Sequence, residues 1–158
     1  MNTPLFQNDP RLLSRPSIRT HGCYFRQLSQ LAEKHAGTAL EDRQVIEQYD
    51  WLLENGKMID ELGRQAFVLD PTAVGKAAQF YLGVPQTFRV VSRVSSPGYD
   101  EHDFDTGEKP NYWLAMGYIK DALIPHFWEI DERLGALWDS LWPVRPKLQI
   151  LSVRGFVL

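Results

Sequence analysis

The sequence predicts an α+β fold in which helices come first and an antiparallel sheet follows. Helical spacing of apolar residues dominates from residue 23 to residue 82, and β-forming residues dominate after residue 86. Helical and strand segments do not alternate along the chain, which favours α+β over a doubly wound parallel sheet. With 158 residues and 44% hydrophobic content, the chain has the size and composition of one globular domain, expected over residues 1–158.

Three helices are predicted in the first half, after an irregular segment over residues 1–19. They are expected over residues 23–36, 41–54 and 71–82, with a short connector between the second and the third. Gly37 and Gly83 suit the residue that follows a helix, and Asp70 before Pro71 suits a helix start. Ser17 or Thr20 is available to cap the first helix.

Five strands are predicted in the second half, because β-branched and aromatic residues gather there between turn signals. They are expected over residues 86–94, 112–119, 126–131, 135–139 and 148–158. Residues 95–110 form a polar, acidic segment with two prolines and two glycines, predicted as an exposed loop. This acidic loop is either solvated surface or a lid over a functional site. Asp103 and Asp105 lack the further ligands of a calcium loop, so we expect no metal site.

Composition excludes several classes of protein. A net charge of −3 argues against nucleic-acid binding by phosphate neutralisation. No apolar run approaches the roughly 20 residues of a membrane span, and the start of the sequence carries no signal-peptide pattern, so we expect no membrane partner and a cytoplasmic location. A single cysteine excludes internal disulfides and cysteine-rich zinc sites, and nothing indicates a cofactor.

That single cysteine, Cys23, follows Gly22 at the predicted start of the first helix. Unpaired backbone N–H groups and the positive end of the helix dipole favour a thiolate there, and the thiolate is the nucleophilic form. The other interpretation is a small buried cysteine of the core.

A cysteine nucleophile needs a base, and the base needs an acceptor that orients it. Of the four histidines, His126 is the best candidate, because it follows Pro125 at the mouth of a predicted strand, and Asp139 lies on the next strand. A four-residue hairpin loop over residues 131–134 would pair Ile130 with Gly135. It would also set His126 opposite Asp139, with Cβ atoms about 5 Å apart.

The remaining histidines and the tryptophans have simpler interpretations. His21 and His35 are expected at the surface or in structural roles, and His102 lies in the acidic loop. Trp128 either packs in the core or, if it shares a face with His126, lines a substrate groove.

Several short stretches together resemble a known superfamily. They are Gly22-Cys23-Tyr24-Phe25 with Leu31-Ala32-Glu33, the stretches 126–131 and 137–139, and the closing strand over residues 148–156. With the order Cys, His, Asp, these stretches resemble the papain-like cysteine peptidases in the compact form of double-glycine (bacteriocin-processing) peptidases. The chain looks closer still to a small uncharacterised family, common in bacteriophages and prophages, that belongs to this superfamily. The resemblance runs from about residue 17 to the end.

The resemblance implies a cysteine-dependent amide-bond hydrolase with a catalytic triad. Cys23 would be the nucleophile, His126 the base and general acid, and Asp139 the residue that orients the imidazole. It implies a protein or peptide substrate, with a peptidoglycan peptide included, and a phage-encoded enzyme in the host bacterial cytoplasm. The sequence departs from the superfamily because no glutamine lies just before the cysteine. The backbone N–H of Cys23 could donate one hydrogen bond to the oxyanion of the reaction. The second donor would then be Gln7, Thr20 or His21.

Two other functions use the same features. A catalytically weak or inactive papain-like module would bind a phage or host protein, and the missing glutamine favours it. An acyltransferase would pass the acyl group to an amine instead of water.

Overall fold

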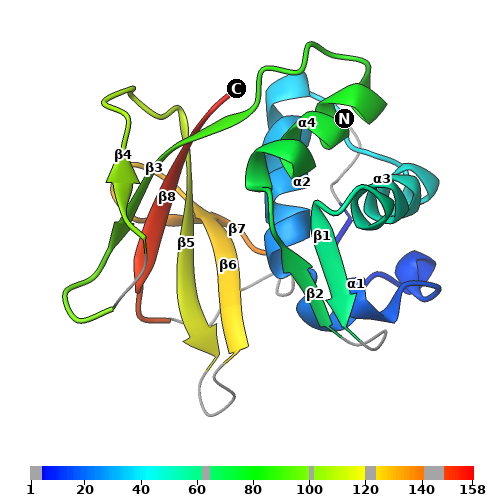
Figure 1. Ribbon diagram of the computed structural model, residues 1–158, viewed down its shortest axis with the longest axis horizontal. Helices are drawn as coiled ribbons and strands as arrows, with labels where there is room; N and C mark the ends of the chain where they lie inside the picture. The colour runs from blue at the N-terminus through cyan, green and yellow to red at the C-terminus, as the bar shows by residue number, and fades with distance from the viewer. Residues whose placement is uncertain (1–4, 62–64, 100–101, 120–123, 141–147) are drawn as a thin grey trace.

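The computed structural model describes residues 5–61, 65–99, 102–119, 124–140 and 148–158. Helices occupy one side of the molecule and an antiparallel sheet the other, which confirms the predicted α+β class (Figure 1). The helices of the described chain are the 3-10 turn η1 (Pro10–Leu12), α1 (Pro16–His21), α2 (Cys23–Ala36), α3 (Asp42–Glu54) and α4 (Pro71–Leu82). Its strands are β1 (Met58–Glu61), β2 (Gln65–Val68), β3 (Arg89–Ser95), β4 (Phe104–Asp105), β5 (Tyr112–Ile119), β6 (Ile124–Ile130), β7 (Ala136–Trp138) and β8 (Ser152–Val157).

The three predicted helices are confirmed almost to the residue, because their end signals act locally. Gly37 and Gly83 follow α2 and α4 with φ of 76° and 71°, a left-handed conformation that suits glycine. The Asp70 carboxylate accepts a hydrogen bond from the Ala73 backbone N–H and so caps α4. The expected cap of α2 is wrong: its N-cap is Gly22, and no side chain caps it.

Two predictions about the helical half are also wrong. The segment over residues 1–19 is not irregular throughout, since it contains η1 and most of α1. The connector after α3 contains β1, which pairs with β2 in an antiparallel hairpin. These elements have only three to six residues each, too few to establish a hydrophobic period. Ser17 donates its hydroxyl hydrogen bond to Asp60 of β1, which links the two missed elements.

The acidic loop over residues 95–110 is partly strand. β3 extends to Ser95, and β4 pairs with β3 through Arg93 and Phe104. Asp103 accepts hydrogen bonds from the backbone N–H and the hydroxyl of Ser95. Within the described parts of the chain, no three His, Cys, Asp or Glu side chains gather as a metal ion would require.

The six-stranded sheet has the order β4-β3-β8-β5-β6-β7, and each of these neighbouring strand pairs is antiparallel. β8 therefore lies between β3 and β5, although it follows both in the chain. Helix α2 contacts α1 and α4 within the helical half and β6 of the sheet (Figure 1). Its Phe25, Leu28 and Leu31 are fully buried in the core, so α2 holds the two halves together.

Helix α2 also carries a buried ion pair. The Arg26 guanidinium lies 2.9 Å from the Glu33 carboxylate, and both side chains are at most 1% exposed. Arg26 also donates to the carbonyl of Leu5, and Glu33 accepts from the backbone N–H of Leu40. The pair thus joins α2 to the segment before α1 and to the connection before α3.

Replacing Gly75 with alanine is expected to destabilise the protein, although alanine normally favours a helix over glycine by about 1 kcal/mol. A Cβ atom at Gly75 would lie 2.1 Å from the Phe88 ring, which is fully buried. We expect a loss of about 1–3 kcal/mol in the free energy of unfolding, measured by urea titration. Adding Phe88→Leu should recover part of the loss, whereas a stabilised Gly75→Ala variant would contradict the packing argument.

Candidate active site

Cys23 is the first residue of α2, and its sulfur lies at the end of the helix that faces β6. The Sγ atom is 3.6 Å from the carbonyl oxygen of Pro125, and the residue is 6% exposed. Gly22 allows α1 to run closely into α2, because a Cβ atom there would lie 2.3 Å from the carbonyl oxygen of Ile18. The N-cap of α2 is Gly22, and no side chain caps this helix start beside Cys23, where the helix dipole favours an anion.

His126 of β6 lies between two of the predicted site residues. Its Nε2 atom is 2.6 Å from Oδ2 of Asp139, and both side chains are almost completely buried. The Cys23 thiol is also a hydrogen-bond partner of the imidazole. Since Asp139 engages Nε2, Nδ1 is the ring nitrogen available to the sulfur. The structure therefore brings Cys23, His126 and Asp139 together from α2, β6 and the residue after β7.

The surroundings of His126 favour its charged form. Burial by itself lowers the pKa, but the hydrogen bonds to Asp139 and Cys23 and their negative charge raise it to about 9. At neutral pH the ring is therefore an imidazolium that donates to Asp139 on one side and to the sulfur on the other.

The predicted register between β6 and β7 is wrong, yet it placed Asp139 on the face of the sheet that carries His126. Ile130 pairs with Ala136 rather than with Gly135, which is a shift of one residue. A bulge then shifts the register once more, so that Glu129 pairs with Trp138. Two shifts of one residue restore the original face, because side chains alternate along a strand. Asp139 follows Trp138 and reaches His126 from that face.

The His126 imidazole packs against the indole of Trp128, which is fully buried. The two rings stack with centroids 6.1 Å apart and an angle of 20°. Gly117 lies directly opposite His126 on β5, where a Cβ atom would come within 2.4 Å of the Gln149 carbonyl oxygen. Trp128 thus shares a face with His126, yet it packs in the core, which is the first of the two interpretations given for it above.

Sequence reasoning missed the contacts that fix α2 against β6 and β7. The Gln27 amide donates to the carbonyl of Trp138 at 3.3 Å, and the Lys34 ammonium lies 2.6 Å from the buried Glu129 carboxylate. Cys23, Gln27 and Lys34 lie at i, i+4 and i+11, on one face of the helix. That spacing is the signal that could have revealed them.

A groove of about 240 Å³ opens beside Cys23, between the β1–β2 hairpin and the sheet. Its walls are mostly apolar or aromatic, with two arginines. The lining residues are Cys23, Tyr24, Ala66, Phe67, Val68, Arg93, Tyr99, Met116, Pro125, Phe127 and Arg154. Tyr99, from the acidic loop, contributes to this wall.

Two of the three candidate oxyanion donors already have hydrogen bonds to backbone carbonyls. The Gln7 amide donates to Arg19 at 3.1 Å and accepts from the Ser140 hydroxyl at 2.7 Å, so Gln7 joins α1 to the residue after Asp139. The Thr20 hydroxyl donates to Pro16 at 3.2 Å. The side chain of His21, the third candidate, lies outside the described part of the structure.

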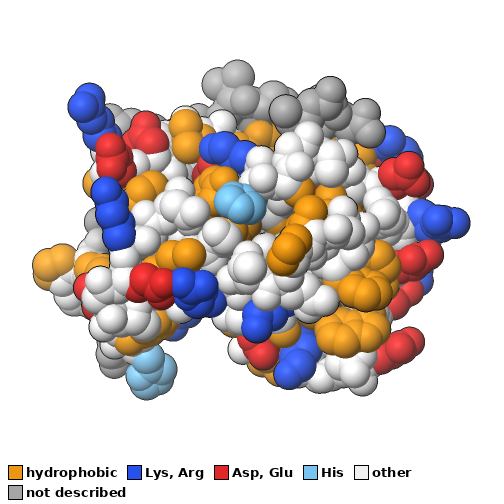
Figure 2. Space-filling model, turned by 90° about the horizontal axis from the view of Figure 1, so that it is seen from above, with side chains coloured by type: hydrophobic (Ala, Val, Ile, Leu, Met, Phe, Trp, Pro, Cys, Tyr) orange, Lys and Arg blue, Asp and Glu red, His pale blue; other side chains and the backbone are white. Residues whose placement is uncertain are grey.

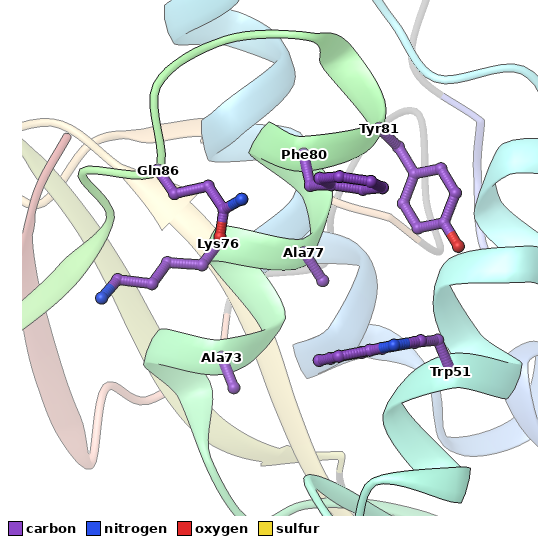
Figure 3. Close-up of a pocket in the computed structure, with 7 residues that line it drawn as sticks. All are labelled: Trp51, Ala73, Lys76, Ala77, Phe80, Tyr81 and Gln86. Carbon is purple, nitrogen blue, oxygen red and sulfur yellow. The ribbon is translucent and has the colours of Figure 1, made fainter.

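A second cavity, of about 300 Å³, lies between α3 and α4 and shares no lining residue with the groove. Figure 3 shows Trp51 of α3 facing the α4 side chains, with Lys76 and Gln86 on the other side. Trp51 and Phe80 are 43% and 64% exposed. Figure 2 shows hydrophobic side chains gathered over the helical half of the molecule. None of the described residues that line this cavity is a cysteine, a histidine or an acidic residue, and none belongs to the candidate active site.

No helix in the described ranges is both long enough and apolar enough to cross a bilayer. Comparisons of the chain with protein-family models, with curated proteins and with solved structures found no match.

Proposed function

We propose that this protein is a papain-like, cysteine-dependent hydrolase of amide bonds, acting as a peptidase or amidase. The observation that carries the proposal is the buried imidazole of His126, which has the Cys23 thiol on one side and the Asp139 carboxylate on the other. A nucleophile, a base and an orienting acceptor in this order are the parts that thiol-based acyl transfer requires.

The steps follow from this arrangement. The Cys23 thiolate, favoured by the imidazolium and the start of α2, adds to the carbonyl carbon and forms a C–S bond. The carbonyl oxygen becomes an oxyanion, which the first N–H groups of α2 stabilise. His126 then gives its proton to the leaving amine nitrogen as the C–N bond breaks. Neutral His126 next takes a proton from water, which attacks the thioester, releases a carboxylic acid and restores the pair.

We extend the proposal to a protein or peptide substrate, a peptidoglycan peptide among them. A groove with apolar walls that reaches the sulfur suits the side chains beside a scissile peptide bond. A cytoplasmic location suits an enzyme that needs a reduced thiol. A phage-encoded enzyme in the bacterial host follows from the sequence resemblance alone.

The test is the rate of Cys23 alkylation by iodoacetamide as a function of pH. A free thiol with a pKa of about 8.5 is only about 0.3% ionised at pH 6. We expect Cys23 to react roughly 10- to 100-fold faster than N-acetylcysteine at this pH. His126→Ala should remove the advantage, because it removes the imidazolium.

The matched control is His35→Ala, because His35 is an exposed histidine at the far end of α2 that contacts Tyr112. It should leave the pH profile unchanged. Slow alkylation that does not respond to His126→Ala would contradict the hydrolase proposal and favour the papain-like binding module. If the site is reactive, the product formed with added amines separates hydrolysis from acyl transfer.

A further inference from the structure

We propose that Gln7 and Gln27 are positioning residues of the candidate active site, which hold Asp139 where its carboxylate reaches His126. Each glutamine acts on a chain neighbour of Asp139 rather than on the reacting atoms. This inference rests on the proposed function and goes beyond it, because it assigns the groups that fix the acceptor of the triad.

The sheet gives Asp139 little support of its own. β7 (Ala136–Trp138) is a three-residue strand at the edge of the sheet, and a bulge interrupts its pairing with β6. A bulge disrupts the hydrogen bonds of a strand pair locally. Asp139 follows the last paired residue of β7, so the hydrogen bonds of the sheet end just before it. The distance of 2.6 Å between Asp139 and His126 therefore needs contacts from outside the sheet.

Gln27 holds the residue before Asp139. Its Nε2 atom donates a hydrogen bond to the carbonyl oxygen of Trp138 at 3.3 Å. Gln27 is fully buried in α2, about one helical turn after Cys23. The chain just before Asp139 is thus attached to the helix that carries the candidate nucleophile.

Gln7 holds the residue after Asp139 through two hydrogen bonds. Its backbone N–H donates to the carbonyl of Ser140 at 2.8 Å, and its Oε1 atom accepts from the Ser140 hydroxyl at 2.7 Å. Its Nε2 atom donates to the carbonyl of Arg19 in α1 at 3.1 Å. Gln7 and Ser140 are both buried. Because α1 leads through Gly22 directly into α2, Gln7 also attaches Asp139 to the helices beside Cys23.

These contacts place all three candidate site residues relative to α1 and α2. Cys23 is the first residue of α2, and its Sγ atom contacts the carbonyl of Pro125, the residue before His126. Asp139 is held at both of its neighbours. A misplacement of about 1 Å can cost roughly 100-fold in rate, so contacts that fix the acceptor relative to the nucleophile matter for catalysis.

The chemistry of the Gln27 position supports this role. Gln27 is 0% exposed, and its Oε1 atom accepts no hydrogen bond from the described residues. A buried amide oxygen without a partner lowers stability, and a methionine or leucine would fill similar space without that cost. What glutamine adds here is the donor that reaches the carbonyl of Trp138.

The test is an NMR titration of the His126 ring in Gln7→Met and Gln27→Met of the full chain. Methionine has a similar length, but its thioether cannot donate a hydrogen bond. The Asp139 carboxylate is then held less closely, so its charge supports the imidazolium less. We expect the pKa of His126 to fall from about 9 by roughly one unit in each variant.

A milder variant keeps the test open if a methionine variant fails to fold. Ser140→Ala removes the hydroxyl that donates to Gln7 and leaves the hydrogen bond between the Gln7 N–H and the Ser140 carbonyl in place. We expect a smaller fall of the His126 pKa in the same direction.

The matched control is Gln48→Met. Gln48 of α3 is also a fully buried glutamine whose amide donates to a backbone carbonyl, that of Val74 at 3.1 Å. Its replacement should lower stability to urea and leave the pKa of His126 unchanged. An equal fall of this pKa in Gln48→Met would indicate a general loosening of the protein and overturn the inference.

A double variant tests whether Gln27 acts through Asp139. Once Asp139→Asn has removed the carboxylate, adding Gln27→Met should lower the pKa of His126 no further. A further fall would show that Gln27 affects the ring by another route, which would contradict its assignment as a positioning residue for Asp139.

The remaining outcomes separate the inference from the proposed function. An unchanged His126 pKa in folded Gln7→Met, Gln27→Met and Ser140→Ala would overturn the inference alone, provided that Cys23 alkylation is fast and depends on His126. Slow alkylation of Cys23 that does not respond to His126→Ala would overturn the proposed function, and the catalytic role of both glutamines with it.

Discussion

Replacing Asp139 with asparagine is expected to lower the pKa of His126 from about 9 toward its ordinary value of about 6.5. The change removes the negative charge 2.6 Å from Nε2, while burial continues to disfavour the imidazolium. Without a charged His126, the thiolate loses its partner and the leaving amine loses its acid. We expect the hydrolysis rate to fall by roughly 100- to 10,000-fold.

The direct measurement is the titration of the His126 ring by NMR, assigned by the loss of its signal in His126→Ala. Glu132→Gln, an exposed change in the β6–β7 turn, is the matched control and should not move the midpoint. An unchanged His126 midpoint in Asp139→Asn would show that the carboxylate does not hold the imidazolium.

The same pKa shift sets the pH dependence of stability. Because the folded-state pKa lies above the unfolded-state value, the charged ring stabilises the fold fully below about pH 6.5. This contribution, about 3 kcal/mol for a shift of this size, is lost as pH rises through about 9. Asp139→Asn should therefore destabilise the protein most between about pH 5 and 6.5 and much less above pH 9, as urea titrations at each pH would show.

Replacing Glu33 with alanine is expected to reduce the free energy of unfolding by about 3–5 kcal/mol. The change leaves the Arg26 guanidinium, which is 0% exposed, without its carboxylate, and it removes the acceptor of the Leu40 N–H group. Urea or thermal unfolding measures the loss. The matched control is Glu47→Ala, which breaks the exposed pair of Arg43 and Glu47 at 3.6 Å and should change stability by less than about 0.5 kcal/mol.

A double replacement separates the cost of an unpaired charge from the value of the pair. Arg26→Met with Glu33→Leu removes both charges and keeps most of the volume, so we expect it to recover most of the loss. A Glu33→Ala variant as stable as the Glu47→Ala control would mean that water or another group reaches Arg26.

The elements that the sequence predicted best are those whose ends are set by residues close to them in the chain. The ends of α2 and α4 depend on a cap or a glycine within a few residues, so their bounds could be read directly. α1 and the β1–β2 hairpin could not, because short elements are stabilised by contacts with distant residues, such as that between Ser17 and Asp60.

In the candidate site, too, some features could be predicted from the sequence and others depend on distant parts of the chain. The sequence predicts Cys23, His126 and Asp139 because their chemistry is distinctive and their order fits one mechanism, and the structure places His126 next to each of the other two. The β6–β7 register came out on the correct face only because a loop shift and a bulge cancel. The pairing of Arg93 with Arg154 could not be predicted, because it depends on the position of β8 in the sheet.

That position of β8 also has a consequence for how the protein folds. β4 and β3 form one part of the sheet and β5, β6 and β7 another, and β8 joins the two parts. All five of these strands are synthesised before β8, so the sheet stays in two separate pieces until β8 inserts between them. Contacts between residues so distant in the chain form slowly. We therefore expect β8 insertion to limit the folding rate, and the wall of the groove that carries Arg154 to form last.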